Sequence, residues 1–177
     1  MQTQYRKVKQ YLKLIDQAAH CNRRPVENIT MVDCGYKTDN SFPALDTMKP
    51  FKSGDTWGTG LDSHAWFHFH LDIPEDMRDK PVQLVIRSEH ERWVSSTPQF
   101  LLFVDGVMRQ GMDTQHWYFN LETSEKTDFD IFVYAYNSEY FAQSKFNAEI
   151  RNVNVETEAL WYDIDIAFDA LGFLKPD

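Results

Sequence analysis

The stretch Ala65-Trp-Phe-His-Phe-His-Leu-Asp-Ile73 alternates in character from one residue to the next, and it decides the fold. All of its odd-numbered positions are apolar, whereas the even-numbered positions hold Trp66, His68, His70 and Asp72. Successive side chains of a strand point to opposite faces of a sheet, so the apolar set shares one face. We therefore predict a β-strand over 65–73.

Further short strands are predicted on both sides of this one. The segment 100–104 ends in Asp105-Gly106 and resumes at Val107. This pattern predicts a hairpin, because Asp-Gly adopts the positive φ angles of a type I′ turn. Other strands are expected at 26–36, 82–86, 116–121, 128–136 and 148–155. Short strands at this spacing predict a mainly-β fold, a two-sheet antiparallel β-sandwich of jelly-roll or galactose-binding-like type.

Both ends of the chain change to a helical period. Near the N-terminus the apolar residues recur at three- and four-residue intervals, as in an amphipathic helix: Tyr5, Val8, Leu12, Ile15 and Ala19. This helix should end near His20, before a polar run that a proline closes. A second helix is predicted from an N-cap at Thr157. The chain thus divides into a helix and connector (1–24), a β-sandwich (25–156) and a closing helix (157–177).

The closing helix is unusually apolar. Its main stripe is widened by Trp161, Tyr162 and Ile166 beyond what one contact normally buries. We expect such a helix to need a second partner. The chain stops only a few residues later, so we interpret its end as a cut before a further domain.

Charge and composition exclude several classes of partner. The net charge of -9 repels phosphate backbones and anionic lipids, so no nucleic acid is expected. The N-terminus has no apolar signal region, and no stretch approaches the roughly 20 apolar residues of a membrane span. We expect a cytoplasmic protein that does not contact membranes. Cys21 and Cys34 are then expected as free thiols, although Cα atoms within about 7 Å would permit a disulfide.

One group of residues has metal-ligand character. His68, His70 and Asp72 share a strand face, with His64 just upstream, and could converge on one ion. The alternative is that they are the polar positions of an alternating strand, and we favour it because no closed ligand set can be read from one strand. The sequence also contains no G-x-S-x-G elbow and no G-x-G-x-x-G after a strand. Neither a metal site nor catalytic residues are predicted in this chain.

Exposed aromatic side chains would offer a platform for sugar rings. Most of the tryptophans are expected in the core. Trp57 lies in the glycine-rich stretch Lys52-Ser-Gly-Asp-Thr-Trp-Gly-Thr-Gly60, which predicts a tight loop that presents the indole. Trp93 also has a loop-like context. We single out Trp57 and Trp93 as binding or interdomain residues, following the enrichment of tryptophan at contact surfaces.

Three segments in order resemble the N-terminal domain of cytosolic-type α-mannosidases of glycoside hydrolase family thirty-eight. The first is Phe51-Lys-Ser-Gly-Asp-Thr-Trp-Gly, running on to His64-Ala-Trp-Phe67 and Ile73-Pro74. The second combines Phe103-Val-Asp-Gly106 with Gly111-Met-Asp-Thr-Gln-His116, and the third is Glu158-Ala-Leu-Trp-Tyr-Asp163. The resemblance covers about two-thirds of the chain, from Phe51 to the end.

The resemblance implies a β-sandwich that precedes a catalytic α/β barrel, with the zinc ion and the nucleophilic aspartate in the barrel. The triplet His70-Leu71-Asp72 matches the start of the family's metal motif but continues Ile-Pro-Glu, so we attribute it to strand alternation. Asp113 and His116 match a Gly-x-Asp-x-x-His pattern. They are expected to hold a loop that faces the catalytic domain, the alternative being a turn-stabilising aspartate and a hydrogen-bonded histidine.

These observations give one leading hypothesis and two rivals. The leading hypothesis is a non-catalytic domain of a zinc-dependent, retaining α-mannosidase that packs on and supports the catalytic domain of the same chain. The first rival is a free-standing carbohydrate-binding module that binds mannose-containing saccharides through Trp57 or Trp93. The second is a small metalloenzyme built on His68, His70 and Asp72.

Overall fold

The alternating stretch forms β5 (Ser63–Asp72), which lies inside a six-stranded antiparallel sheet. The computed structural model describes residues 2–37, 39, 41–58, 60–88, 98–113, 116–138 and 144–173. The strands of this sheet run in the order β3-β2-β5-β10-β7-β8. The other five are β3 (Lys49–Phe51), β2 (Ile29–Cys34), β10 (Asp128–Asn137), β7 (Gln99–Val104) and β8 (Val107–Met112).

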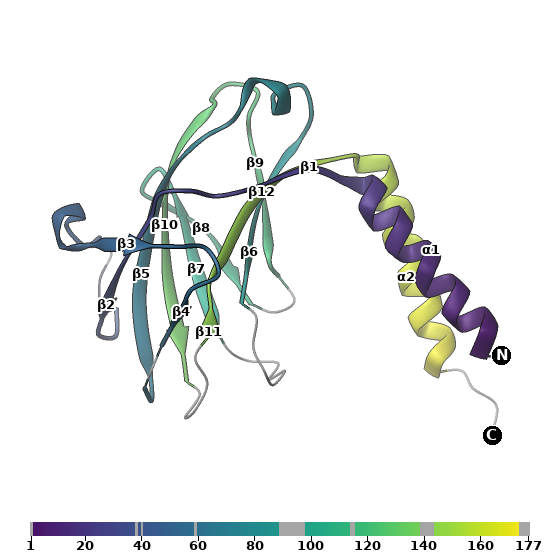
Figure 1. Cartoon of the computed structure of the whole chain (residues 1–177), viewed down its shortest axis with the longest axis horizontal. Coiled ribbons are helices and arrows are strands. Elements are labelled where there is room, and N and C mark those ends of the chain that lie inside the picture. Colours follow the sequence, from purple (N-terminus) through teal and green to yellow (C-terminus); the bar gives the residue numbers. More distant parts are fainter. Residues whose placement is uncertain are drawn as a thin grey trace.

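A four-stranded antiparallel sheet faces the first one (Figure 1). Its order is β1-β12-β6-β9, formed by β1 (His20–Pro25), β12 (Asn147–Val153), β6 (Val82–Arg87) and β9 (Tyr118–Leu121). A two-stranded ribbon joins β4 (Thr56–Trp57) to β11 (Ser144–Lys145), and two 3-10 turns lie at Leu45–Thr47 and Glu75–Met77. The predicted mainly-β, two-sheet antiparallel sandwich of jelly-roll type is confirmed.

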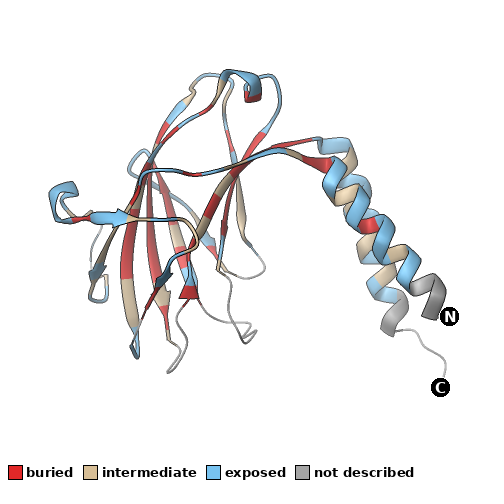
Figure 2. Ribbon diagram, in the orientation of Figure 1, coloured by how far each residue is buried: buried red, intermediate tan, exposed pale blue. Residues whose placement is uncertain are grey.

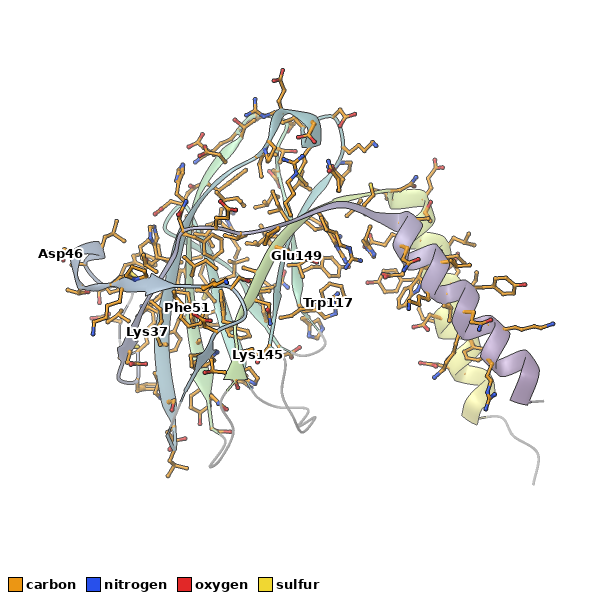
Figure 3. The ribbon with its side chains drawn as sticks, viewed as in Figure 1. Lys37, Asp46, Phe51, Trp117, Lys145 and Glu149 are labelled. Carbon is orange, nitrogen blue, oxygen red and sulfur yellow. The ribbon has the colours of Figure 1, made fainter. Side chains whose placement is uncertain are left out.

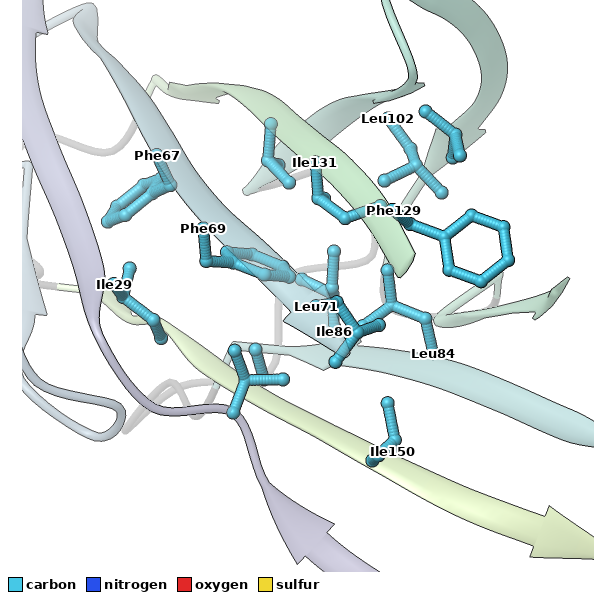
Figure 4. Packing of buried hydrophobic residues seen from close by; sticks show 14 of the residues in the cluster. Ile29, Phe67, Phe69, Leu71, Leu84, Ile86, Leu102, Phe129, Ile131 and Ile150 are labelled. Atoms are coloured by element: carbon cyan, nitrogen blue, oxygen red, sulfur yellow. The ribbon is translucent and has the colours of Figure 1, made fainter. Parts of the chain in front are cut away.

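The core fills the space between the two sheets. Phe67, Phe69 and Leu71 of β5 point into it, and across it lie Leu84, Ile86 and Ile150 of the smaller sheet (Figure 4). Each fully buried side chain of this size stabilises the fold by about 1.5–3 kcal/mol. Slipping β5 by one residue against β10 would move this whole set to the other face, so burial fixes the register Phe69↔Ile131.

A second apolar cluster covers the outer face of the six-stranded sheet. Trp66, Phe103, Phe132 and Tyr134 are buried there, and Phe42 from the segment after β2 packs on them with ring centroids 4.7–5.5 Å from three of these rings. At Trp66, on the even-numbered face of β5, the chain itself therefore covers the sheet.

The predicted helices are present, with different boundaries. α1 (Gln2–Ala19) and α2 (Val155–Phe173) pack side by side and extend away from the sandwich, with both chain ends at the far end of the pair (Figure 1). The polar run expected as a connector is strand β1, because it pairs with β12 at His20↔Val153. The N-cap of α2 is Asn154 rather than Thr157, since Asn154 Oδ1 accepts the Thr157 N–H at 3.1 Å.

The predicted hairpin is confirmed. Val104 pairs with Val107, and the two turn residues have positive φ angles, 52° at Asp105 and 78° at Gly106, as a type I′ turn requires. The other predicted strands are found with shifted ends, and the short strands β3, β4 and β11 are additional. β3 contains Pro50, which is compatible with its place at the edge of the sheet.

Candidate functional site

The helix pair is attached to the sandwich through a buried polar network. Since β1 and β12 are paired, the end of α1 and the start of α2 leave the sheet together. His20, only 6% exposed, lies between them, with Nδ1 2.7 Å from Asp16 Oδ1 and Nε2 3.0 Å from Glu158 Oε1. Gln83 of β6 donates from Nε2 to the same Glu158 oxygen at 3.2 Å. One carboxylate therefore links both helices to the smaller sheet.

A fully buried arginine extends this network along the outer face of the smaller sheet. Arg151 of β12 donates from Nε and Nη2 to Gln83 Oε1 at 2.8 and 2.6 Å, and its guanidinium lies 4.8 Å from the centre of a Trp117 ring. In the described part of the chain no hydrogen-bond partner is found for its Nη1. Burial lowers the pKa of Arg151 to about 10. Arg87 lies over Trp117 at 3.9 Å, and burial lowers its pKa as well.

The side of α2 nearest this network is apolar. Val155, Ala159, Tyr162 and Ile166 recur at helical spacing and share one helix face. The Tyr162 hydroxyl lies 3.2 Å from the Tyr118 hydroxyl of β9, which shows that this face is directed toward the smaller sheet. Burial raises the pKa of Tyr162.

Much of this helix face is nevertheless uncovered. Val155 is 57% exposed and Ile166 67% exposed. We call the apolar face of α2, together with Arg87, Arg151, Trp117 and Tyr118, the helix–sheet junction. Trp117 lies on the side of the sandwich that faces the helices, whereas Asp46 lies on the opposite side of the molecule (Figure 3).

The helix pair exposes further apolar side chains. Tyr11 and Leu14 of α1 and Leu160 of α2 are each at least half exposed. Figure 2 shows the same contrast, with buried residues concentrated in the strands and exposed ones along the helices. The excess apolar surface that the sequence predicts for the closing helix is therefore present in the fold.

Trp57 is not on the surface. The loop around it is tight, with positive φ angles at Gly54 and Gly58, but it turns the indole inward to 2% exposure. The ring packs edge-on against Phe67 at 5.7 Å and near Phe100 at 6.2 Å. The expectation that this loop presents Trp57 is wrong, because β4 pairs with β11 and closes the core at this end.

The other predicted site residues have different outcomes. Trp93 lies outside the described residues. Asp113 and His116 hold a turn together: Asp113 Oδ1 accepts the His116 N–H at 2.7 Å and lies 3.1 Å from His116 Nδ1, while the Asp113 N–H donates to the His116 carbonyl at 3.2 Å. This is the turn-stabilising role that was left open for them. A contact with a catalytic domain stays a prediction.

Asp113 also borders a hollow of about 860 Å³ on the outer face of the six-stranded sheet. The hollow is lined by Tyr36, Asp62, His64, Gln99, Tyr134 and Tyr136, along with Gly111 and neighbouring residues of β7 and β8. We call it the tyrosine hollow. Sequence reasoning missed it, because its residues come from five separate segments and only the pairing of β2, β5, β10, β7 and β8 brings them together.

The histidines of β5 do not gather around a common point. His68 Nε2 lies 2.7 Å from Asp130 Oδ1, and His70 lies 3.6 Å from Asp72. Among the described residues no group of three or more His, Cys, Asp or Glu side chains could hold a metal ion. The zinc that the resemblance implies would belong to the catalytic domain.

The two cysteines are free and half-buried. Burial, followed by the nearby Asp33 charge, raises the pKa of Cys34 to about 11. Neither described helix is long and apolar enough to cross a membrane.

Comparison with known proteins gives one family. The family described as "Alpha-mannosidase, jelly roll domain" matches residues 24–158. No curated protein matches the chain. One similar solved structure is a beta-glucuronidase of an uncultured Clostridium species, with a TM-score of 0.49, 12% sequence identity and 78% of this chain covered. Another is a β-glucuronidase from Ruminococcus gnavus in complex with D-glucaro 1,5-lactone, with a TM-score of 0.43, 9% identity and 77% of this chain covered. The matched region is 30% of each of those chains.

Proposed function

We propose that this chain, which belongs to the family of alpha-mannosidase jelly roll domains, is a non-catalytic part of an α-mannosidase that packs on and supports the catalytic region. The family membership supports the connection to α-mannoside hydrolysis. The observation that carries the packing role is the helix–sheet junction.

The helix–sheet junction has the features of an interdomain contact. Its apolar face is fixed at the N-terminal end of α2, because Glu158 is bound to both His20 and Gln83. Its accessible centre is the Trp117 ring with the exposed Arg87 over it, supported by the fully buried Arg151, and tryptophan and arginine are enriched in contact surfaces. Uncovered apolar side chains in one patch are typical of surfaces that bind another protein part.

Burial of this patch would stabilise the contact appreciably. Complete burial of an exposed isoleucine or valine contributes about 1.5–3 kcal/mol. Ile166 and Val155 are more than half exposed, so together they would supply about 2–4 kcal/mol when covered. The zinc ion and the nucleophilic aspartate would belong to the catalytic region. The free thiols of Cys21 and Cys34 support a cytoplasmic location.

Two measurements test this proposal. The 177-residue chain alone should release no nitrophenol from 4-nitrophenyl α-D-mannoside, with or without added zinc. It should bind the catalytic region of an α-mannosidase of this family that has been expressed without its jelly roll domain, as measured by calorimetry. Metal-dependent turnover by the chain alone would refute the non-catalytic role.

A matched pair of variants locates the contact. Ile166→Asp should weaken this association by roughly tenfold or more, because a carboxylate would be buried in an apolar contact. Leu45→Asp is the control, since Leu45 is 55% exposed and lies in the 3-10 turn that contains Asp46, far from the helices (Figure 3). Equal affinities of the two variants would contradict a contact at the helix–sheet junction.

A further inference from the structure

We propose that the tyrosine hollow is a binding site for a neutral pyranose sugar, with mannose the sugar expected from the chain's family. The site goes beyond the packing role, because it lies on the outer face of the other sheet and uses no residue of the helix–sheet junction. It is also built from residues other than Trp57 and Trp93.

The wall of the hollow is a row of aromatic rings that strand pairing sets in order. His64 of β5 lies directly opposite Tyr136 of β10, and their rings stack with centroids 4.9 Å apart and an interplanar angle of 26°. Tyr134 of the same strand also stacks with His64, at 5.7 Å and 22°. Tyr36 meets His64 edge-on at 5.9 Å and is 77% exposed. Tyr36 is therefore the ring available for stacking with a ligand.

Hydrogen bonds fix this row in place. The Tyr134 hydroxyl accepts the Lys37 N–H at 2.9 Å and lies 2.7 Å from His64 Nδ1. The hydroxyl can both donate and accept, so it bonds His64 Nδ1 in either tautomer of the imidazole and leaves Nε2 at the edge of the row. The Tyr136 hydroxyl donates to Asp62 Oδ1 at 2.9 Å, and this bond raises the pKa of Tyr136.

Donors and acceptors remain at the edge of the rings. Among the described residues no partner is found for His64 Nε2, for the second carboxylate oxygen of Asp62, or for the exposed amide of Gln99. A sugar ring presents the matching groups, because its C–H face stacks on an aromatic ring while its hydroxyls both donate and accept. The volume of about 860 Å³ lies within the usual range for small-molecule sites.

The charge of the described lining disfavours anionic ligands. Among the described residues that line the hollow are the carboxylates of Asp62 and Asp113 and no lysine or arginine, and the chain carries a net charge of -9. A phosphate or carboxylate would be repelled, since none of these residues supplies a cation to offset its desolvation. A neutral polyhydroxylated ligand meets no such cost.

One wall of the hollow is bare backbone, which provides a direct test. Gly111 of β8 lines the hollow, and a Cβ built there would meet nothing within 4 Å. Its φ angle is not positive, so a side chain is tolerated, and an aromatic residue suits a strand. Gly111→Phe should therefore fill the hollow without disturbing the fold. Met108→Phe is the matched control, because Met108 is 62% exposed on the same strand and does not line the hollow.

Calorimetric titration of the chain with methyl α-D-mannopyranoside and with an α-linked mannobiose tests the proposal. We expect saturable binding that Gly111→Phe weakens by tenfold or more and that Met108→Phe leaves unchanged. Asp62→Asn should weaken binding by roughly tenfold through loss of a charged acceptor, and asparagine tolerates the φ of 50° found here. Tyr36→Ala should weaken binding by roughly threefold to tenfold through loss of stacking, with Tyr11→Ala, at an exposed tyrosine of α1, as control.

Several outcomes would overturn the proposal. These are the absence of saturable binding up to roughly tens of millimolar sugar, equal affinities of Gly111→Phe and Met108→Phe, or binding of tetramethylammonium in place of sugar. Urea unfolding midpoints equal to that of the unmodified chain verify that the variants are folded. Association with the catalytic region, measured with Ile166→Asp, is independent of these results, so failure of the sugar site and failure of the packing role can be told apart.

Discussion

Truncation of Trp57 distinguishes a packing role from a binding role for this residue. The indole is 2% exposed and contacts the rings of Phe67 and Phe100, so Trp57→Ala removes a large buried side chain and leaves a cavity. Tryptophan-to-alanine changes in cores cost about 3–5 kcal/mol. For a chain of this length this corresponds to a fall in melting temperature of roughly 6–20 °C. Affinity for mannosides should be unchanged at temperatures where the variant is folded.

Trp57→Phe refines this prediction. Among the described residues the buried indole Nε1 has no hydrogen-bond partner, and an unpaired buried donor lowers the stability by about 1–3 kcal/mol. Phenylalanine removes this unpaired donor and keeps most of the ring, so its net cost should be only about 1–2 kcal/mol. Urea unfolding followed by tryptophan fluorescence and circular dichroism measures both variants, with Tyr36→Ala as an exposed control. An unchanged unfolding midpoint for Trp57→Ala would refute the buried placement.

Three further predictions concern the loops and the outer sheet face. Gly58→Ala should lower the free energy of unfolding by about 2 kcal/mol and Gly106→Ala by about 1 kcal/mol, as thermal unfolding can measure. Both glycines have φ near 77°, but only at Gly58 would a Cβ meet a side-chain amide, at 3.2 Å. The hydrogen bond from Lys126 holds the pKa of Asp105 below its ordinary value of 3.8. The ionised Asp105 therefore stabilises the fold above pH 3.8, and this stabilisation is lost as the pH falls. Acid unfolding curves of Asp105→Asn should not show this pH dependence. Burial raises the pKa of Cys34 to about 11, so the free energy of unfolding should fall as the pH rises from 9.0 toward 11. Cys34→Ala should remove this part of the pH dependence, and iodoacetamide at pH 8 should label Cys34 faster after unfolding.

The structural elements followed from local patterns. The period of two in β5 predicted a strand, because alternation records which side of a sheet is buried, and another strand was expected over 128–136. That these two strands are neighbours in one sheet is a result of the structure. Asp105-Gly106 gave a hairpin, since its φ angles are a local property of the turn. The predicted boundaries of the helices and strands agree less well with the structure. The run over 20–25 is polar and contains a proline, yet pairing with β12 makes it an edge strand.

The positions of the candidate site residues were harder to predict from the sequence than the helices and strands. Asp113 and His116 are three positions apart, and their turn is local enough to be anticipated. Trp57 was placed on the surface because glycines surround it, but glycine reports the backbone angles and not the direction in which the neighbouring side chain points. That direction depends on the pairing of β4 with β11, which are far apart in the chain.

The sequence by itself determined that this chain is a β-sandwich with helical ends, that its closing helix has more apolar surface than one contact covers, and that it resembles the N-terminal domain of cytosolic-type α-mannosidases. These properties depend on periodicity and on order along the chain. Only the tertiary structure decided that Trp57 is core, that Glu158 joins both helices to the smaller sheet, and that Tyr36, Asp62, His64 and Tyr136 share a hollow. Such contacts join residues many positions apart, and they exist only once strand order and register bring distant segments onto one face.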